Sequence, residues 1–129
     1  MNRKRRDLNR VVLAIFAPIL VVAGILGFVV PADMSVVSGA PAYNVFHLVA
    51  GVIGLAIVLV NNPALASTFN VGFGLIDVYQ AVASVAHLFP ERWFLWTRVD
   101  DVLHVVIGIG LVVVGLCGRA PRRGRTSGV

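Results

Sequence analysis

Four apolar runs divide the chain. Apolar residues dominate the ranges 11–30, 43–60, 64–88 and 101–117, and polar or turn-forming residues separate these ranges. A helix that rises about 1.5 Å per residue needs roughly 20 apolar residues to cross the hydrocarbon core of a bilayer, which is about 30 Å thick. Each run is close to that length. The pattern therefore predicts an all-α protein with four membrane-spanning helices.

The segments between the runs predict how the helices are connected. Asn61-Asn62-Pro63 is a very short turn, and Pro63 suits the first position of the helix that follows. Such a turn makes the second and third helices antiparallel neighbours, which predicts an up-down bundle. The range 31–42 contains Pro, Ser and Gly and is expected to be a loop. The range 89–100 carries Trp93 and Trp96, residues typical of the membrane interface.

Polar residues of the third run fall at steps of three and four. That spacing places them on one face of a helix, and the face is expected to point away from lipid. Its members are Ser67, Asn70, Gly74, Asp77, Gln80, Ser84 and His87. Because a carboxylate costs several kcal/mol near the middle of a bilayer, we expect Asp77 to face the bundle interior. Asn70, Asp77, Gln80 and Ser84 thus form a candidate polar cluster inside the membrane.

A short motif occurs twice. The second run opens with Asn44-x-x-His47-x-x-x-Gly51, and the fourth opens with Asp101-x-x-His104-x-x-x-Gly108. The repetition predicts that two helix pairs form a parallel repeat, related by an axis along the membrane normal. His47 and His104 are then expected at equal depth, directed toward the axis of the bundle.

Charge predicts the orientation. The 129 residues are 58% hydrophobic and 13% charged, and the formal net charge is +5. Arginine and lysine gather in a basic head, residues 1–10, and in a basic tail, residues 118–129, on either side of the membrane domain, residues 11–117. The positive-inside rule then predicts a multi-pass protein of the inner (plasma) membrane with both termini in the cytoplasm. We expect the lipid bilayer to be the partner of these basic ends, because no aromatic residues accompany them as in a nucleic-acid surface.

The start of the chain also resembles a secretory signal. Ala40-Pro-Ala42 has the small residues of a cleavage site, but the apolar run before it exceeds the length of a signal peptide. An uncleaved first helix is therefore expected. Cys117 is the only cysteine, so an intrachain disulfide or a cysteine-based metal site is excluded.

The chain resembles a known family. Four apolar runs, the two histidine motifs and the segment Phe69-Asn-Val-Gly-Phe-Gly-Leu75 are similar to the bacterial four-helix membrane proteins catalogued as domain of unknown function 4383. The resemblance covers about residues 11–116 and implies a multi-pass protein without an assigned activity. It singles out the motif residues Asn44, His47, Gly51, Asp101, His104 and Gly108. It does not include Asp77 or Gln80.

The simplest role for the motif is structural. Asn44 and Asp101 are favoured helix N-caps, and each would accept a hydrogen bond from the backbone N–H of the histidine three residues later. The histidines would bond to neighbouring helices, and the glycines would let backbones approach closely. This interpretation needs no cofactor and predicts an accessory membrane subunit, within a homo-oligomer or a larger membrane complex.

Three alternative interpretations assign the polar residues a function in binding or transport. His47 and His104 have the arrangement expected of two axial ligands to haem b. His47, His87 and His104 form a candidate site for a divalent metal, to which Asp100, Asp101 or Glu91 could add a carboxylate. Imidazole with carboxylate suits zinc and other transition metals. Asp77, Gln80, Ser84 and His87 form a candidate proton or ion pathway. No hydrolase or phosphate-binding motif occurs, so an enzyme is not expected.

Overall fold

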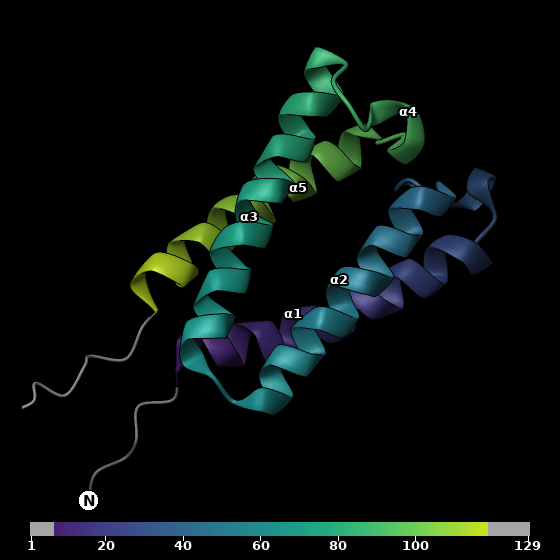
Figure 1. Cartoon of the computed structure of the whole chain (residues 1–129). Coiled ribbons are helices and arrows are strands. Elements are labelled where there is room, and N and C mark those ends of the chain that lie inside the picture. The colour runs from purple at the N-terminus through teal and green to yellow at the C-terminus, as the bar shows by residue number, and fades with distance from the viewer. Residues whose placement is uncertain (1–6, 119–129) are drawn as a thin grey trace, which may run out of the picture.

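The computed structural model describes residues 7–118, and all regular structure in that range is helical. The elements are α1 (Leu8–Val29), the 3₁₀ turn η1 (Ala32–Met34), α2 (Pro41–Val60), α3 (Pro63–Ala86), α4 (Glu91–Phe94) and α5 (Arg98–Cys117). Most of the basic head and the basic tail lie outside the described residues. Figure 1 shows two pairs of long helices, α1 with α2 and α3 with α5.

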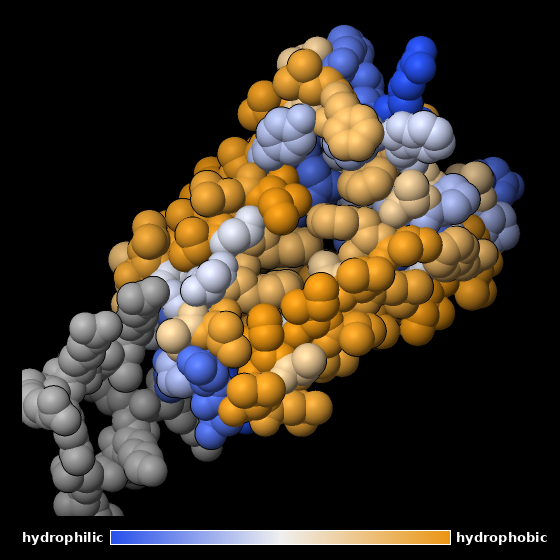
Figure 2. Space-filling view, in the orientation of Figure 1, coloured by the Kyte–Doolittle hydropathy of each residue, from blue (hydrophilic) through white to orange (hydrophobic). Residues whose placement is uncertain are grey.

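Four of these helices, α1, α2, α3 and α5, are long and apolar enough to cross a membrane. Their outward faces carry exposed large apolar side chains, which suit contact with lipid; among them are Ile15, Val52, Leu75 and Val106. In Figure 2 the long sides of the molecule are mostly hydrophobic, and hydrophilic residues gather toward its two ends. The predicted all-α fold with four long apolar helices is confirmed. The up-down order and the parallel repeat stay predictions.

The helices begin earlier than the apolar runs suggest. Asp7 caps α1 by accepting hydrogen bonds from the backbone N–H groups of Asn9 and Arg10, so α1 starts inside the predicted basic head. Pro41 starts α2, because its fixed φ suits a first helical turn. The prediction that Pro63 opens α3 is confirmed, and Asn62 caps that helix.

The predicted N-cap roles of Asn44 and Asp101 are wrong. Helix α2 already begins at Pro41, after Ala40, so Asn44 lies in its first turn. Helix α5 begins at Arg98 because Thr97 and Asp100 form a capping box. Both histidines therefore lie almost two turns inside their helices.

Glycines set the close packing within each pair. A Cβ atom on Gly51 would lie 2.9 Å from the carbonyl oxygen of Ala17 in α1. A Cβ atom on Gly108 would lie 2.8 Å from the carbonyl oxygen of Gly74 in α3. Contacts between the two pairs are much sparser than contacts within them. The protein is therefore two tightly packed helix pairs that touch along a looser interface.

Four phenylalanines fill the middle of that interface. The Phe73 ring lies 5.6 Å from Phe16, 5.7 Å from Phe46 and 5.5 Å from Phe69. Buried Leu20, Ala50 and Leu111 pack against the same cluster. We call these four rings the phenylalanine core.

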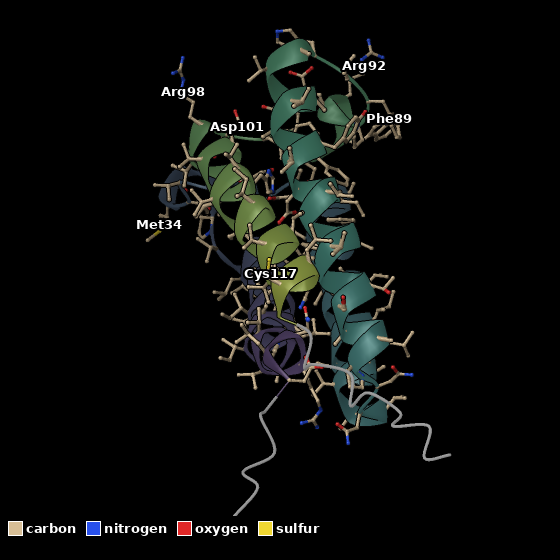
Figure 3. All side chains as sticks on the ribbon, turned by 90° about the vertical axis from the view of Figure 1, so that its left-hand side faces the viewer. Met34, Phe89, Arg92, Arg98, Asp101 and Cys117 are labelled. Carbon is tan, nitrogen blue, oxygen red and sulfur yellow. The ribbon has the colours of Figure 1, made fainter. Side chains whose placement is uncertain are left out.

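The two ends of the molecule differ. We call the end that carries residues 30–40 and 87–97 the loop end, and the end that carries Asp7, Asn61 and Gly118 the terminal end. Figure 3 shows Arg92 and Arg98 projecting from the loop end, with Cys117 near the other end of α5. Cys117 is exposed, so it is not a packing residue.

At the terminal end, two buried asparagines join the pairs. Asn70 donates from Nδ2 to the carbonyl oxygen and to Oδ1 of Asn9, both at 3.1 Å. Arg10 donates to the carbonyl oxygen of Val58 near the end of α2. Polar contacts therefore tie α1 to both α2 and α3 at this end.

Candidate functional site

A buried hydrogen-bond chain joins α2 to α5 near the loop end. The hydroxyl group of Tyr43 lies 2.7 Å from Nε2 of His104 and 3.3 Å from Oδ1 of Asp100. The Tyr43 ring also lies 4.1 Å from the ring of His47, one helical turn further along α2. The structure thus brings both predicted histidines into one cluster, but through a tyrosine that contacts each of them.

Asp100 is the most heavily bonded member of this cluster. Its Oδ2 accepts from the backbone N–H of Ser38 at 2.8 Å and from the backbone N–H and hydroxyl of Thr97 at 2.9 and 3.0 Å. The side chain is 2% exposed. Because it accepts from the loop before α2, from α2 and from the cap of α5, Asp100 holds three segments together.

These contacts determine which group donates and which accepts at each step of the hydrogen-bond chain. Asp100 only accepts, so the Tyr43 hydroxyl donates its one proton to Oδ1 of Asp100. The tyrosine oxygen then accepts from Nε2–H of His104. In that tautomer Nδ1 of His104 is an acceptor, and it has no hydrogen-bond partner among the described residues.

A second chain runs from α3 to the segment after α4. Trp96 donates from Nε1 to Oε1 of Gln80 at 3.1 Å, and Gln80 donates from Nε2 to Oδ1 of Asp77 at 3.2 Å. Asp77 and Gln80 are both buried, which agrees with the inward face predicted for the third run. Trp96 turns inward to make this contact, whereas Trp93 is exposed as an interface residue would be.

The predicted polar face of α3 is divided. Asn70 pairs with Asn9 at the terminal end, and Asp77 with Gln80 lies toward the loop end. Phe73 lies between them on the same face, inside the phenylalanine core. Ser84 is half-buried and makes none of these hydrogen bonds.

His87 lies apart from the other two histidines. It is the C-cap that follows α3, in the left-handed conformation, and it is exposed. Its Nδ1 lies 2.8 Å from Oε1 of Glu91. Within residues 7–118 no three His, Cys, Asp or Glu side chains are placed to hold a metal ion together.

The other motif residues have packing roles. Asn44 donates from Nδ2 to the carbonyl oxygen of Gly39 at 2.9 Å, and its amide fills the space in which a side chain on Gly27 would lie. Oδ1 of Asp101 is buried, and none of the described residues gives it a hydrogen bond. The space beside Gly51 and beside Gly108 is occupied by the neighbouring helix of each pair.

A cavity of about 340 Å³ lies between the two helix pairs. Its apolar wall comes mainly from α1, with Leu103 and Ile107 of α5. Its polar wall is formed by the two histidines of the motif and the residues bonded around them. Those residues are Tyr43, His47, Asp77, Asp100 and His104, with Ser35 and Ser38 of the preceding loop.

Tyr43, Trp96 and Asn9 are absent from the site predicted by the sequence, and Asp100 enters that prediction only as a possible carboxylate ligand of the metal alternative. Tyr43 and Asp100 could have been found by extending the repeated motif one residue toward the N-terminus, because each lies four residues before its histidine. Asn9 lies in the basic head and Trp96 in an interfacial segment, so no pattern marks either as buried.

Comparison with known proteins adds no relative. The chain matches no protein-family model, no curated protein and no solved structure.

Proposed function

We propose that this chain is a multi-pass inner-membrane protein that acts as a structural or accessory subunit, with both termini in the cytoplasm. Its resemblance to the domain of unknown function 4383 proteins is part of this proposal. The polar residues in the membrane hold the two helix pairs in register, and the chain itself performs no reaction.

The observation that carries the proposal is the saturation of Asp100. Its carboxylate receives hydrogen bonds from the backbone N–H groups of Ser38 and Thr97 and from the Tyr43 hydroxyl. The Thr97 hydroxyl, which also lies within hydrogen-bond distance of the carbonyl oxygen of Val36, completes the set. A buried carboxylate whose acceptor sites are filled by the fold itself stabilises that fold, whereas a catalytic or transporting carboxylate must be free to exchange partners. This pattern favours a structural role.

The phenylalanine core argues against a proton or ion pathway. A relay needs polar groups or water at each step across the membrane. Four packed aromatic rings separate Asp77 and Gln80 from Asn70 and Asn9. The polar face of α3 therefore supports two separate clusters better than one pathway.

The contacts around the histidines favour packing over haem or metal binding. A bis-histidine haem needs two free imidazole nitrogens with a flat macrocycle between them. Tyr43 contacts both rings, and His104 uses Nε2 to bond to it. The glycines leave no room for a macrocycle because the helices of each pair fill that space.

Proton flux tests the functional part of the proposal. The purified chain is reconstituted into liposomes that contain a pH-sensitive dye, and a pH gradient is applied. We expect no flux above that of empty liposomes, with or without a membrane potential. A flux that disappears in Asp77→Asn and persists in the control Asp101→Asn contradicts the proposal.

Cysteine labelling tests the orientation. Cys117 marks the terminal end, and Ser35→Cys in a Cys117→Ser background marks the loop end. A membrane-impermeant maleimide added to intact spheroplasts is expected to label the Ser35→Cys chain and to leave Cys117 unlabelled until the membrane is permeabilised. The reverse result places the termini outside the cell.

A further inference from the structure

The cavity between the helix pairs combines an apolar wall with an acidic end. Ile19 and Leu26 of α1 and Val30 just after this helix are among the apolar residues that line it. Asp77 and Asp100 line its polar wall. A cavity of about 340 Å³ with a few convergent polar groups has the size and character of a small-molecule site.

Asp77 is the acidic group that the fold leaves available. The side chain is 3% exposed and faces the cavity, and its one hydrogen bond is the bond from Gln80 to Oδ1. Oδ2 accepts no hydrogen bond from the described part of the chain. Asp100 differs, because its acceptor sites are already filled by Ser38, Tyr43 and Thr97.

The lining supplies no countercharge to Asp77. Among the described residues that line the cavity, none is lysine or arginine. His47 lines it as well, and neither nitrogen of that ring is hydrogen-bonded within residues 7–118. A buried carboxylate is stabilised by a cation or by donated protons. Gln80 donates one hydrogen bond to Asp77, and the described residues of the cavity lining supply no cation.

The polar wall offers further acceptors, beside the one N–H donor that the neutral imidazole ring of His47 carries. In the tautomer assigned above, Nδ1 of His104 carries a lone pair without a partner. The Tyr43 and Phe16 rings line the same space, and the face of an aromatic ring attracts a cation. A ligand that donates hydrogen bonds and carries positive charge complements this set.

We infer that the cavity binds a lipophilic organic cation, a protonated amine with an apolar tail, whose ammonium group pairs with Asp77 and whose tail lies along α1. The two helices that line most of the cavity, α1 and α5, make few contacts with each other. The ligand enters from the bilayer between them. This binding site goes beyond the accessory role and does not depend on it.

Three probes with the same tail test the charge. Octylammonium, octanol and octanoate are each equilibrated with the full-length chain in phosphatidylcholine nanodiscs, and binding to empty nanodiscs is subtracted. We expect octylammonium to bind at least about tenfold more tightly than octanol, because an ion pair in a desolvated site contributes more than 1.4 kcal/mol. Octanoate is expected not to bind. Equal binding of octylammonium and octanol by the wild-type chain overturns the proposal.

Matched variants locate the site. Asp77→Asn keeps the size of the side chain and an oxygen for Gln80 but removes the charge, and it is expected to abolish the preference for octylammonium. Asp101→Asn, outside this cavity, is expected to keep it. An unchanged preference in Asp77→Asn overturns the assignment of the counter-ion.

A steric variant covers the case in which Asp77→Asn does not fold. Ala23 lines the cavity, whereas Ala14 of the same helix is exposed and does not. Ala23→Leu is expected to weaken octylammonium binding by about tenfold or more by filling the cavity, and Ala14→Leu is expected to leave it unchanged. Equal binding by the two variants shows that the amine binds elsewhere and overturns the proposal.

Discussion

The α2 and α5 copies of the repeated motif differ most at the residue just before the asparagine or aspartate. That residue is Tyr43 in α2 and Asp100 in α5, and each lies four positions before a histidine. The two side chains hydrogen-bond to each other. His104 joins the chain through Nε2, whereas His47 contacts the Tyr43 ring and takes no part in the hydrogen bonding.

The glycines of the two copies behave alike. Gly51 lets α2 approach α1, and Gly108 lets α5 approach α3. The shared spacing therefore serves two purposes. The glycine half of the motif packs each helix against its own partner, and the polar half joins the two pairs to each other. Only the polar half requires the two copies to differ, because a hydrogen bond needs a donor on one side and an acceptor on the other.

The largest loss of stability is expected at the two glycines, where the same substitution should have the same effect in α2 and in α5. A side chain on either glycine meets backbone atoms at less than 3 Å, so Gly51→Val and Gly108→Val should each lower the free energy of unfolding by about 3 kcal/mol. The measurement is unfolding in mixed detergent and SDS micelles, followed by circular dichroism.

Gly110→Val is the control for these variants. Gly110 lies on α5 with no atom near its missing side chain, and its substitution should change stability by less than about 0.5 kcal/mol. If Gly110→Val is as destabilising as Gly108→Val, the loss reflects helix propensity and the close approach of the helices is not its cause.

The second largest loss of stability is expected at Asp100, and it should distinguish this residue from its neighbour Asp101 in α5. Asp100→Asn replaces one acceptor oxygen with an NH₂ group, which in either orientation of the amide faces a donor, the Tyr43 hydroxyl on one side or the N–H groups of Ser38 and Thr97 on the other. It should cost about 2 kcal/mol. Asp101 receives no hydrogen bond on its buried Oδ1, so Asp101→Asn should be neutral or slightly stabilising. The midpoint of thermal unfolding in detergent measures both, and equal losses would contradict the special role of Asp100.

The apolar runs alone predict the four long helices, and turn chemistry predicts the start of α3 at Pro63. The step of three to four residues also predicts that Asp77 and Gln80 are buried. These features depend on neighbours within one helix, and a single stretch of sequence contains them.

The contacts of the site depend on residues far apart in the chain. The Tyr43–Asp100 bond joins residues 57 apart and requires the loop before α2 to lie against the cap of α5. Asn9 pairs with Asn70 across 61 residues. The helix starts were predicted too late for a related reason. Asp7 and Thr97 cap their helices from outside the apolar runs, so hydropathy does not mark them.

The third substitution removes the hydrogen bonds between the two copies of the motif and keeps the aromatic ring of residue 43. Tyr43→Phe deletes the donor to Asp100 and the acceptor for His104, and it should cost about 1.5 kcal/mol because two hydrogen bonds between membrane helices are lost. Tyr79→Phe is the matched control, because its hydroxyl bonds to the carbonyl oxygen of Phe89 at an exposed site. The same unfolding assay should show a smaller loss for Tyr79→Phe, and the opposite order would contradict the proposed link between the copies.

The smallest effect, and the sharpest test of the difference between the copies, comes from the histidines. Phenylalanine keeps an aromatic ring at either position but cannot hydrogen-bond. His104→Phe should cost about 1 kcal/mol because Tyr43 loses its donor. His47→Phe keeps the ring contact with Tyr43 and should change stability by less than about 0.5 kcal/mol. Equal costs at the two positions would mean that the imidazoles act as an equivalent pair, as a shared ligand would require. Unequal costs would mean that only the α5 histidine is part of the hydrogen-bond chain that joins the helix pairs.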